Sequence, residues 1–296
     1  MSNIYYFHPA AAQTILAAAR DGLSSVDLSL DLNLTTATWQ IRDNTLILDE
    51  NGPALALSDL ESVAASGSRI FRYDGEKLAP IEVRSGGYFK LVPTDSVPTL
   101  EIDGVKMHRS KDIDPLEDAR LKTELVVRQG NIVLDTCGGL GYSALFAVKA
   151  GASRVVSTEK SREVIRIREQ NPWLAPGARD WQTETALARI NLENADINQR
   201  ITTLEDNTFD AVIHDPPRFT SATGDLYGKV FYAGLFRVMR EGGRLFHYTG
   251  SPKKITRQDR FIQNAMKRLE QAGFSKVSFN DRLQGIYGEK QRPLFP

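Results

Sequence analysis

The sequence predicts an α/β fold in which a mostly parallel sheet carries helices on both faces and follows a small β-rich domain. An apolar run that ends at Asp135 leads into a glycine-rich turn and then into a helical pattern at residues 143–149, the strand–turn–helix order of parallel sheets. A second apolar run at residues 209–213 ends at two adjacent prolines, which stop a strand. Residues 1–100 instead hold short alternating runs between turn signals.

The amino-terminal domain is expected to span residues 1–98. A helix-like opening lies at residues 10–19, and β-rich runs follow at residues 26–30, 37–41, 45–48, 70–73 and 88–92. Turn signals such as Asp74-Gly75 separate these runs. Residues 99–120 are expected to form a linker to a sheet domain at residues 121–296. An appended domain of this kind commonly shapes substrate access; a structural cap or a contact in a homodimer are the alternatives.

Length and composition are compatible with two domains. A chain of 296 residues with 41% hydrophobic residues can bury a sizeable core. No apolar run approaches the ~20 residues of a membrane span, and no basic segment precedes the alanine-rich opening, so we expect a cytoplasmic protein without a membrane partner. The single cysteine, Cys137, excludes an intrachain disulfide framework. No histidine or cysteine cluster has the spacing of zinc ligands, and no metal is predicted.

Charge is distributed unevenly along a chain whose formal net charge is zero. Residues 1–100 contain 7 Lys+Arg and 12 Asp+Glu, which leaves 30 and 25 of the 37 each for the remainder. Residues 241–296 contain 11 basic and 5 acidic residues, among them Lys253, Lys254, Arg257 and Arg260. Such a run would attract phosphates, and an ordinary solvated face is the alternative.

The glycine-rich turn follows the strand that ends at Asp135. Gly139 and Gly141 lack the Cβ that would block a ligand from the backbone, and the helix that follows presents its amino terminus. The next apolar run, residues 154–158, ends at Glu159, 24 residues after Asp135. An acid in this place can accept hydrogen bonds from both hydroxyls of a ribose. The pattern therefore predicts a nucleoside-bearing cofactor.

The loop after residues 209–213 is expected to be catalytic. It reads His214-Asp215-Pro216-Pro217-Arg218-Phe219. Because proline cannot donate to a sheet ladder, the two prolines end the strand and hold the loop rigidly beside the cofactor.

The turn, the acid and the proline loop, in this order, resemble the class I S-adenosylmethionine-dependent methyltransferases over residues 121–279. Their fold is a Rossmann-like sheet of seven mostly parallel strands with helices on both faces. The resemblance implies that the turn holds the methionine end of the cofactor, that Glu159 holds the ribose, and that Asp196, after the third strand, meets the adenine amino group. The cofactor-binding residues that it implies are Asp135, Cys137, Gly139, Gly141, Tyr142, Glu159, Lys160 and Asp196.

Two features refine this resemblance. Cys137 stands where the family's pattern has its first glycine; cysteine is small enough to fit the turn. More narrowly, the HDPPRF loop, Glu159-Lys160 with Asn171-Pro172-Trp173, and the segment at residues 245–248 resemble a family of predicted, mostly archaeal methyltransferases with no established substrate.

Methyl transfer from a sulfonium depends more on orientation than on acid catalysis. In amino-methylating relatives an acid or amide before Pro-Pro holds the target nitrogen, so the resemblance gives that role to Asp215 and Pro216. Arg218 stands where those relatives stack an aromatic on a planar base, and Phe219 follows it. The guanidinium would stack on a base or bind a phosphate or carboxylate with two parallel hydrogen bonds. The expected acceptor is a nitrogen in an RNA base or in a small molecule.

Three other activities remain as alternatives. Methylation at pyrimidine C5, which Asp-Pro-Pro loops also serve, needs a cysteine nucleophile, and Cys137 lies in the cofactor turn instead. Aminopropyl transfer to a polyamine uses a related fold but needs paired acids that are not evident around Asp215. A module that binds the cofactor or nucleic acid without catalysis is the third.

Several side chains complete the candidate set. His214 and His247, near the ends of consecutive predicted strands, could act as a general base; a structural histidine bonded to backbone is the commoner arrangement. Tyr248 would line the substrate side, with a packed aromatic as the alternative. His108 and Arg109 would close over the site from the segment before the sheet domain. Tyr142 and Trp173 would flank the cofactor or belong to the core.

Overall fold

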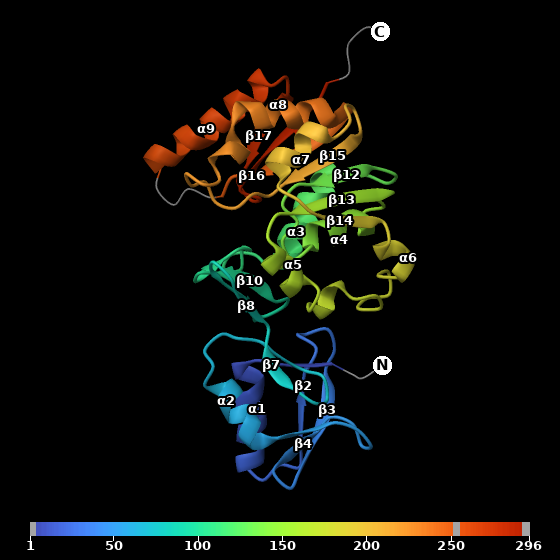
Figure 1. Cartoon of the computed structure of the whole chain (residues 1–296), viewed down its shortest axis with the longest axis vertical. Helices are drawn as coiled ribbons and strands as arrows, with labels where there is room; N and C mark the ends of the chain where they lie inside the picture. Colours follow the sequence, from blue (N-terminus) through green and yellow to red (C-terminus); the bar gives the residue numbers. More distant parts are fainter. Residues whose placement is uncertain (1–3, 251–254, 292–296) are drawn as a thin grey trace. The chain divides into compact units, whose positions relative to one another are not determined.

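The computed structural model of the chain describes residues 4–250 and 255–291, with side chains undescribed at residues 255–259. The chain divides into two compact units (Figure 1). Unit 1 is Met1–Pro115 together with Arg166–Ala178, and unit 2 is Leu116–Ile165 together with Arg179–Pro296. No helix in the described ranges is long and apolar enough to cross a membrane.

Unit 1 is built from small antiparallel sheets and two helices. One sheet has the order β1 (Tyr5–Phe7), β6 (Phe71–Tyr73), β7 (Leu78–Pro80); a second has β2 (Ser25–Leu28), β3 (Ala37–Arg42), β4 (Thr45–Ile47), β5 (Ala54–Ala56); a third has β11 (Val105–Lys106), β10 (Thr99–Ile102), β9 (Tyr88–Val92), β8 (Glu82–Arg84). The helices are α1 (Pro9–Arg20) and α2 (Leu57–Ala64).

The core of unit 1 follows from helix amphipathicity. Pro9 opens α1, where its missing N–H costs no hydrogen bond. The buried face of α1 places Ile15 in one cluster with Leu60 and Val63 of α2 and with Leu46 of β4. The two helices therefore share an apolar layer with strands of the first two sheets.

The structure corrects the expected linker at residues 99–120. Thr99–Ile102 and Val105–Lys106 are strands of the third sheet, paired with β9 in register, and the unit ends at Pro115. These two strands could not be predicted from the sequence because runs of four and two residues are too short to show a periodic pattern.

A second correction concerns residues 166–178, which the sequence placed in the sheet domain. They belong to unit 1. Trp173 is buried, and its Nε1 donates to the carbonyl oxygen of Leu32 over 2.7 Å; the Tyr6 hydroxyl donates to the Gln170 carbonyl over 3.1 Å. Within unit 1, then, Trp173 is a core residue.

Unit 2 contains the predicted seven-stranded, mostly parallel sheet, which is confirmed (Figure 1). Its order is β14 (Ile190–Asn194), β13 (Arg154–Glu159), β12 (Ile132–Asp135), β15 (Phe209–His214), β16 (Met239–Tyr248), β18 (Gly285–Glu289), β17 (Ser275–Asn280). The first five strands are parallel, and β18 is antiparallel to both of its neighbours.

Helices cover both faces of this sheet because successive side chains of a strand point to opposite faces. Val133 of β12 lies in one cluster with side chains of α3 (Pro115–Val126) and α4 (Tyr142–Lys149). Leu134, its neighbour, lies in another with side chains of α7 (Ile197–Thr203), α8 (Lys229–Val238) and α9 (Ile255–Gln271). Other short helices along the chain are α5 (Arg162–Arg168), α6 (Glu184–Leu187) and the 3₁₀ turn Gly224–Tyr227, and a second 3₁₀ turn, Pro172–Leu174, lies in unit 1.

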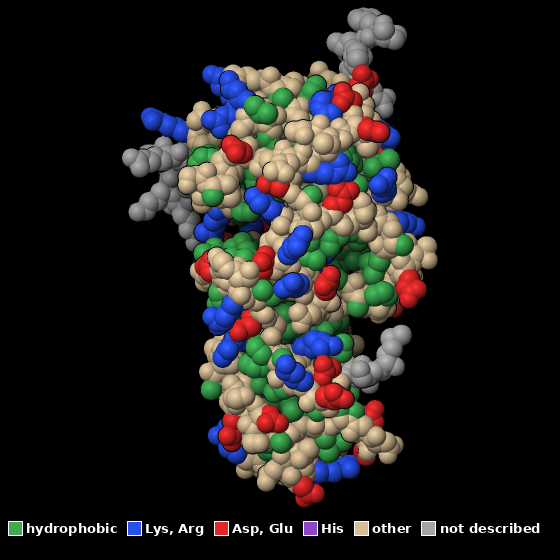
Figure 2. Space-filling view, viewed as in Figure 1, with side chains coloured by type: hydrophobic (Ala, Val, Ile, Leu, Met, Phe, Trp, Pro, Cys, Tyr) green, Lys and Arg blue, Asp and Glu red, His purple; other side chains and the backbone are tan. Residues whose placement is uncertain are grey.

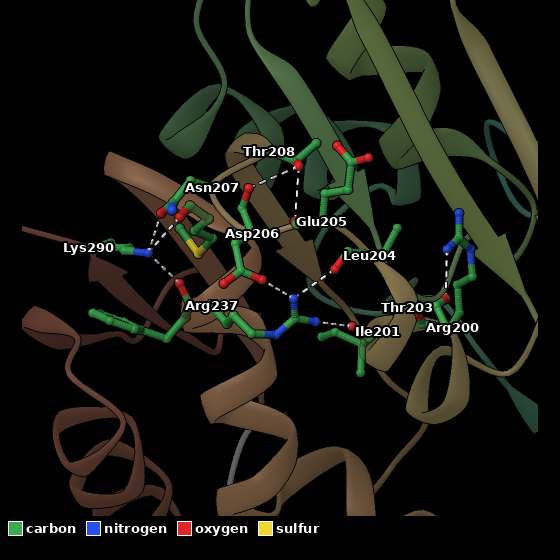
Figure 3. Close-up of polar contacts among 12 residues, drawn as sticks. Arg200, Ile201, Thr203, Leu204, Glu205, Asp206, Asn207, Thr208, Arg237 and Lys290 are labelled. Carbon is green, nitrogen blue, oxygen red and sulfur yellow. Dashed lines mark hydrogen bonds and ion pairs between the residues drawn. The ribbon is translucent and has the colours of Figure 1, made fainter.

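A polar network fixes the connection between α7 and β15 at the strand's amino end (Figure 3). Arg237 of α8 donates to the carbonyls of Leu204 (2.7 Å) and Ile201 (2.6 Å) and pairs with Asp206. Lys290 donates to the Asn207 side chain (2.8 Å) and to two backbone carbonyls. The network thus lies at the amino ends of the parallel strands, opposite to the carboxyl ends where the candidate site is.

Candidate active site at the carboxyl ends of the parallel strands

The glycine-rich turn has the geometry that close ligand approach requires. Gly139 and Gly141 adopt φ of +48° and +87°, values that L side chains rarely adopt. The Gly138 amide donates to the Thr158 carbonyl over 2.8 Å, and the Gly141 amide to the Gly138 carbonyl over 2.7 Å. A Cβ added at Gly139 would meet no atom within 4 Å. The turn is therefore held by one hydrogen bond to β13 and one within the turn, and the position of a Cβ at Gly139 is open space.

Two acids lie at the strand ends next to this turn, and one of them binds it. Asp135, at the end of β12, is 1% exposed, and its Oδ2 accepts from the Ser157 hydroxyl over 2.8 Å. Glu159, at the end of β13, accepts from the Gly139 amide over 3.0 Å and from the Ser161 amide over 2.8 Å. Since a carboxylate has about four lone-pair positions, Glu159 can hold the turn and still accept from ribose hydroxyls.

Cys137 is half-buried in the same turn. Burial, followed by the nearby Glu159 carboxylate, raises the pKa of its thiol well above the ordinary value. The residue therefore stays a neutral thiol, which is a poor nucleophile.

Asp196, the residue expected to meet the adenine, already has polar partners in the structure. Asp196 caps α7 by accepting from the Asn198 amide over 3.0 Å, and it pairs with the Lys160 ammonium over 2.8 Å. Burial pushes the pKa of Asp196 up, but these two hydrogen bonds hold it below its ordinary value. The Lys160 side chain is 76% exposed, so the pair can open at little cost. Tyr142, the first residue of α4, is buried.

The proline loop begins where β15 ends and is fixed from two sides. The Tyr227 hydroxyl donates to the Pro217 carbonyl over 2.9 Å, and the Thr223 hydroxyl donates to the Arg218 carbonyl over 2.7 Å. Pro216 is buried, whereas Pro217 is exposed. These hydrogen bonds restrict the loop, as expected from its two prolines. They do not test its catalytic role, which stays a prediction.

Arg218 and Phe219, at the end of this loop, are accessible to solvent. Both are exposed, and the Phe219 side chain keeps 54% of its surface accessible. Its ring packs at 5.5 Å from Tyr227 and 5.1 Å from Phe261, centroid to centroid. The loop therefore presents an exposed arginine next to an aromatic ring that packs on Tyr227 and Phe261.

Lys122 is the site residue that the sequence analysis missed. From α3 its ammonium lies 2.8 Å from Asp215 Oδ2, 2.6 Å from Asp118 Oδ2 and 4.2 Å from the centre of the Tyr248 ring. Its side chain is 4% exposed. Burial pushes the pKa of Lys122 down, but the Asp215 and Asp118 carboxylates raise it above its ordinary value. In sequence, Asp118 and Lys122 are an ordinary i,i+4 helix pair. Their position in the site becomes visible only from the contact of Lys122 with Asp215, which lies far along the chain.

The two histidines near the strand ends lie in the protein interior. His214 Nε2 is 3.0 Å from the Leu226 carbonyl, which can only accept, so Nε2 carries the hydrogen and Nδ1 accepts from the Thr136 hydroxyl at 2.7 Å. His247 Nε2 lies 2.8 Å from the Tyr232 hydroxyl, and the two imidazoles stack at 4.5 Å. Burial lowers the pKa of His214 to about 4 and that of His247 well below its ordinary value. This geometry favours the structural alternative for both, and we leave them out of the proposed catalytic set.

The remaining candidates lie elsewhere. His108 belongs to unit 1, where its Nδ1 is 2.8 Å from the Thr99 hydroxyl, and Arg109 follows it; their closure over the site stays a prediction. Lys253 and Lys254 lie outside the described residues, and Arg260 is exposed. Acidic and basic side chains are interspersed over much of the face in Figure 2, so the charge difference along the sequence is not seen there as two regions of opposite sign. No group of three or more potential metal ligands occurs within the described ranges.

Comparison with known proteins places this chain in a family. No protein-family model matches the chain. The uncharacterized protein MJ1233 of Methanocaldococcus jannaschii is 36% identical over 269 residues, which cover 90% of this chain and 89% of that protein. The chain belongs to the family of MJ1233. Since that name assigns the family no activity, the narrower resemblance to methyltransferases with an HDPPRF loop stays a prediction.

More distant matches support the methyltransferase class. Ribosomal RNA large subunit methyltransferase I of Escherichia coli is 25% identical over 258 residues; the match covers 80% of this chain but only 60% of that enzyme's length. Among solved structures, spermidine synthase in complex with the transition state analogue AdoDATO has a TM-score of 0.53 at 16% identity and covers 72% of this chain and 73% of its own. The latter shows a shared fold alone. The sequence similarity supports the class I S-adenosylmethionine-dependent methyltransferases that the motifs predicted.

Proposed function

We propose that the chain transfers a methyl group from S-adenosylmethionine to a nitrogen of an RNA base or of a small molecule, with the Asp215-Pro216-Pro217-Arg218 loop positioning the acceptor. One observation carries this proposal. The glycine turn and Asp215 follow β12 and β15, and Glu159 is the last residue of β13; these three strands are adjacent in the sheet. In open parallel sheets, ligands bind at this edge.

The residues at this edge fit the cofactor. The open space above Gly139 admits a ligand against the backbone, Glu159 supplies acceptors for ribose hydroxyls, and Asp196 would accept from the adenine amino group. S-adenosylmethionine, when bound, supplies a methyl group on a sulfonium, which an aligned lone pair attacks readily. What the protein must add is orientation and exclusion of water.

Asp215 is suited to orient an acceptor amine. Its Oδ2 accepts from Lys122, its side chain is 28% exposed, and none of the described residues donates a hydrogen bond to Oδ1. Oδ1 can therefore accept a hydrogen from the acceptor nitrogen and fix the direction of its lone pair. The rigid Pro216 and Pro217 segment keeps this oxygen in place.

RNA is the favoured acceptor class. The exposed Phe219 ring can stack on a base, and the Arg218 guanidinium can bind a phosphate. The similarity to an enzyme named for ribosomal RNA supports the same class. A small-molecule acceptor with a carboxylate or phosphate for Arg218 is the second candidate.

The other activities receive less support. A polyamine is cationic, and Asp215 already pairs with the Lys122 ammonium, which would repel a second cation. Methylation at pyrimidine C5 would need a thiolate, and the raised pKa keeps Cys137 protonated.

Calorimetric titration with S-adenosylhomocysteine tests the cofactor, with NADH as the competing ligand and Glu159→Ala as the variant. We expect binding that Glu159→Ala weakens by about tenfold or more, because hydrogen bonds to a charged group are worth about 1.5–3 kcal/mol. Preference for NADH would refute the cofactor assignment.

The acceptor is tested with RNA from a strain that lacks the gene, digested to nucleosides. A methylated nucleoside missing from that strain would identify an RNA target. An unchanged nucleoside profile would favour the small molecule. A non-catalytic module is excluded if Asp215→Ala abolishes transfer and retains the affinity for S-adenosylhomocysteine.

A further inference from the structure

A buried ammonium stands directly behind the proposed acceptor-binding carboxylate. Lys122 comes from α3, Asp215 follows β15, and 93 residues separate them in the sequence. The ammonium is shared between Asp215 Oδ2 at 2.8 Å and Asp118 Oδ2 at 2.6 Å. Lys122 and Asp118 have side chains that are only 4% and 6% exposed, whereas Asp215 is 28% exposed. The cluster thus has a dry end at Asp118 and an accessible end at Asp215.

We propose that Lys122 is a positioning residue for the acceptor: it binds Asp215 through Oδ2 and so leaves Oδ1 in a fixed place for the acceptor nitrogen, while Asp118 fixes Lys122. This inference rests on the proposed function, because it gives Asp215 the role of holding the acceptor. It assigns a task to a residue of α3, outside the motifs of the turn and the loop.

The geometry favours positioning over simple charge neutralisation. A pair made only to stabilise α3 could lie on the helix surface, where i,i+4 pairs avoid the cost of desolvation. Here the ammonium is buried instead, and the Tyr248 ring lies 4.2 Å from it on a further side. Two carboxylates and one aromatic ring restrict where the ammonium can move. Asp215 is consequently held from a rigid helix as well as by its own loop.

Charge also explains why the cation is needed. Asp118 and Asp215 lie within hydrogen-bonding distance of one ammonium, so without it two carboxylates would face each other and tend to share a proton. Titratable groups close to this cluster include Tyr248 on β16, whose ring lies beside the ammonium, and Cys137, His214 and Tyr227, whose pKa values the Asp215 carboxylate raises. His214 is neutral and Cys137 stays protonated, so neither supplies a positive charge, whereas the Lys122 ammonium pairs with both acids.

The test compares variants that separate charge balance from positioning. Lys122→Met removes the ammonium and keeps the length of the stem. Lys122→Met with Asp118→Asn also removes the charge that would be left buried. Lys122→Arg keeps a cation, and Lys149→Met is the matched control, since Lys149 is an exposed lysine of α4 whose ammonium lies 5.2 Å from the Trp181 ring.

Each protein is assayed for transfer of a radiolabelled methyl group from S-adenosylmethionine to RNA, and separately to a small-molecule extract, both from a strain that lacks the gene. Affinity for S-adenosylhomocysteine, thermal unfolding and the pH dependence of the rate are measured in parallel. We expect Lys122→Met to lose about 100-fold in transfer, the scale of a misplaced reacting group, with S-adenosylhomocysteine affinity changed less than about twofold. The acid limb of its pH profile should move to higher pH, because the two carboxylates then share a proton.

The double variant decides between the two roles. If Lys122 positions Asp215, the double variant regains thermal stability but not methyl transfer, Lys122→Arg regains part of the transfer, and Lys149→Met behaves as the wild type. Full transfer by the double variant would overturn the inference while leaving the proposed function in place. A wild-type protein that transfers no methyl group to either pool would overturn the proposed function, and the inference with it.

Discussion

Replacing Gly139 with alanine separates the backbone strain of the cofactor turn from its role in binding. Gly139 has φ of +48°, and an added Cβ would meet no protein atom within 4 Å. The substitution therefore costs the left-handed conformation alone, about 1–2 kcal/mol. For a unit of this size the melting temperature should fall by about 2–4 °C per kcal/mol.

The affinity for S-adenosylhomocysteine should fall much further than this strain alone would cause. The new methyl group would occupy the space through which a ligand reaches the turn, so we expect a loss of at least about tenfold, or 1.4 kcal/mol. Gly130→Ala is the matched control, because Gly130 has φ of +81° with equally open surroundings but precedes β12 at its other end. Calorimetry and thermal unfolding are run on both variants. Equal affinities for the two would refute the assignment of the turn to the cofactor.

Three further predictions test the rest of unit 2. Glu159→Gln keeps the size of the side chain but removes the charge that accepts from the Gly139 and Ser161 amides, so calorimetry should show S-adenosylhomocysteine bound about tenfold more weakly. Arg237→Met leaves the Leu204 and Ile201 carbonyls without their donor, so urea unfolding should show a loss of about 2–4 kcal/mol with unchanged affinity for S-adenosylhomocysteine. The pKa of His214 falls from 6.5 to about 4 on folding, so between these values the unfolded chain takes up a proton that the folded chain excludes, and stability should decline by about 1.4 kcal/mol per pH unit as pH falls. Unfolding in urea at pH 7 and pH 5 should show a smaller decline for His214→Asn; an equal decline would contradict a buried neutral imidazole.

The sheet of unit 2 and the approximate place of its site could be predicted from the sequence because their signals are local. Asp135 and Glu159 are the last residues of predicted strands and Asp215 comes directly after another, and the carboxyl ends of parallel strands meet at one edge of a sheet. The turn glycines permit positive φ values, which Gly139 and Gly141 adopt. Each of these signals occupies a few consecutive residues, and the order of the elements brings them together.

Lys122 and Trp173 could not be placed in this way because their surroundings depend on distant segments. Lys122 shows only a helix pair with Asp118 until the loop that carries Asp215 is laid against α3. Trp173 follows an asparagine and a proline that resemble a family motif, yet its indole donates to Leu32, 141 residues earlier. Whether a polar group is buried depends on which distant segment packs over it, and the residues next to it in the sequence do not predict that segment.

The buried polar groups near Asp215 together explain why positioning, rather than proton transfer, is the chemistry that this site supports. The His214 nitrogens are bonded to Thr136 and Leu226, so this imidazole holds the end of β15 and offers no lone pair to an acceptor. The Cys137 thiol stays protonated because of burial and Glu159. Lys122 is charged and bound to two carboxylates, so it cannot act as a base either. Within the described part of the chain, the polar side-chain atom that this arrangement presents is Asp215 Oδ1, and a carboxylate oxygen that accepts from an amine is sufficient for attack on a sulfonium methyl group, whose departure needs no acid.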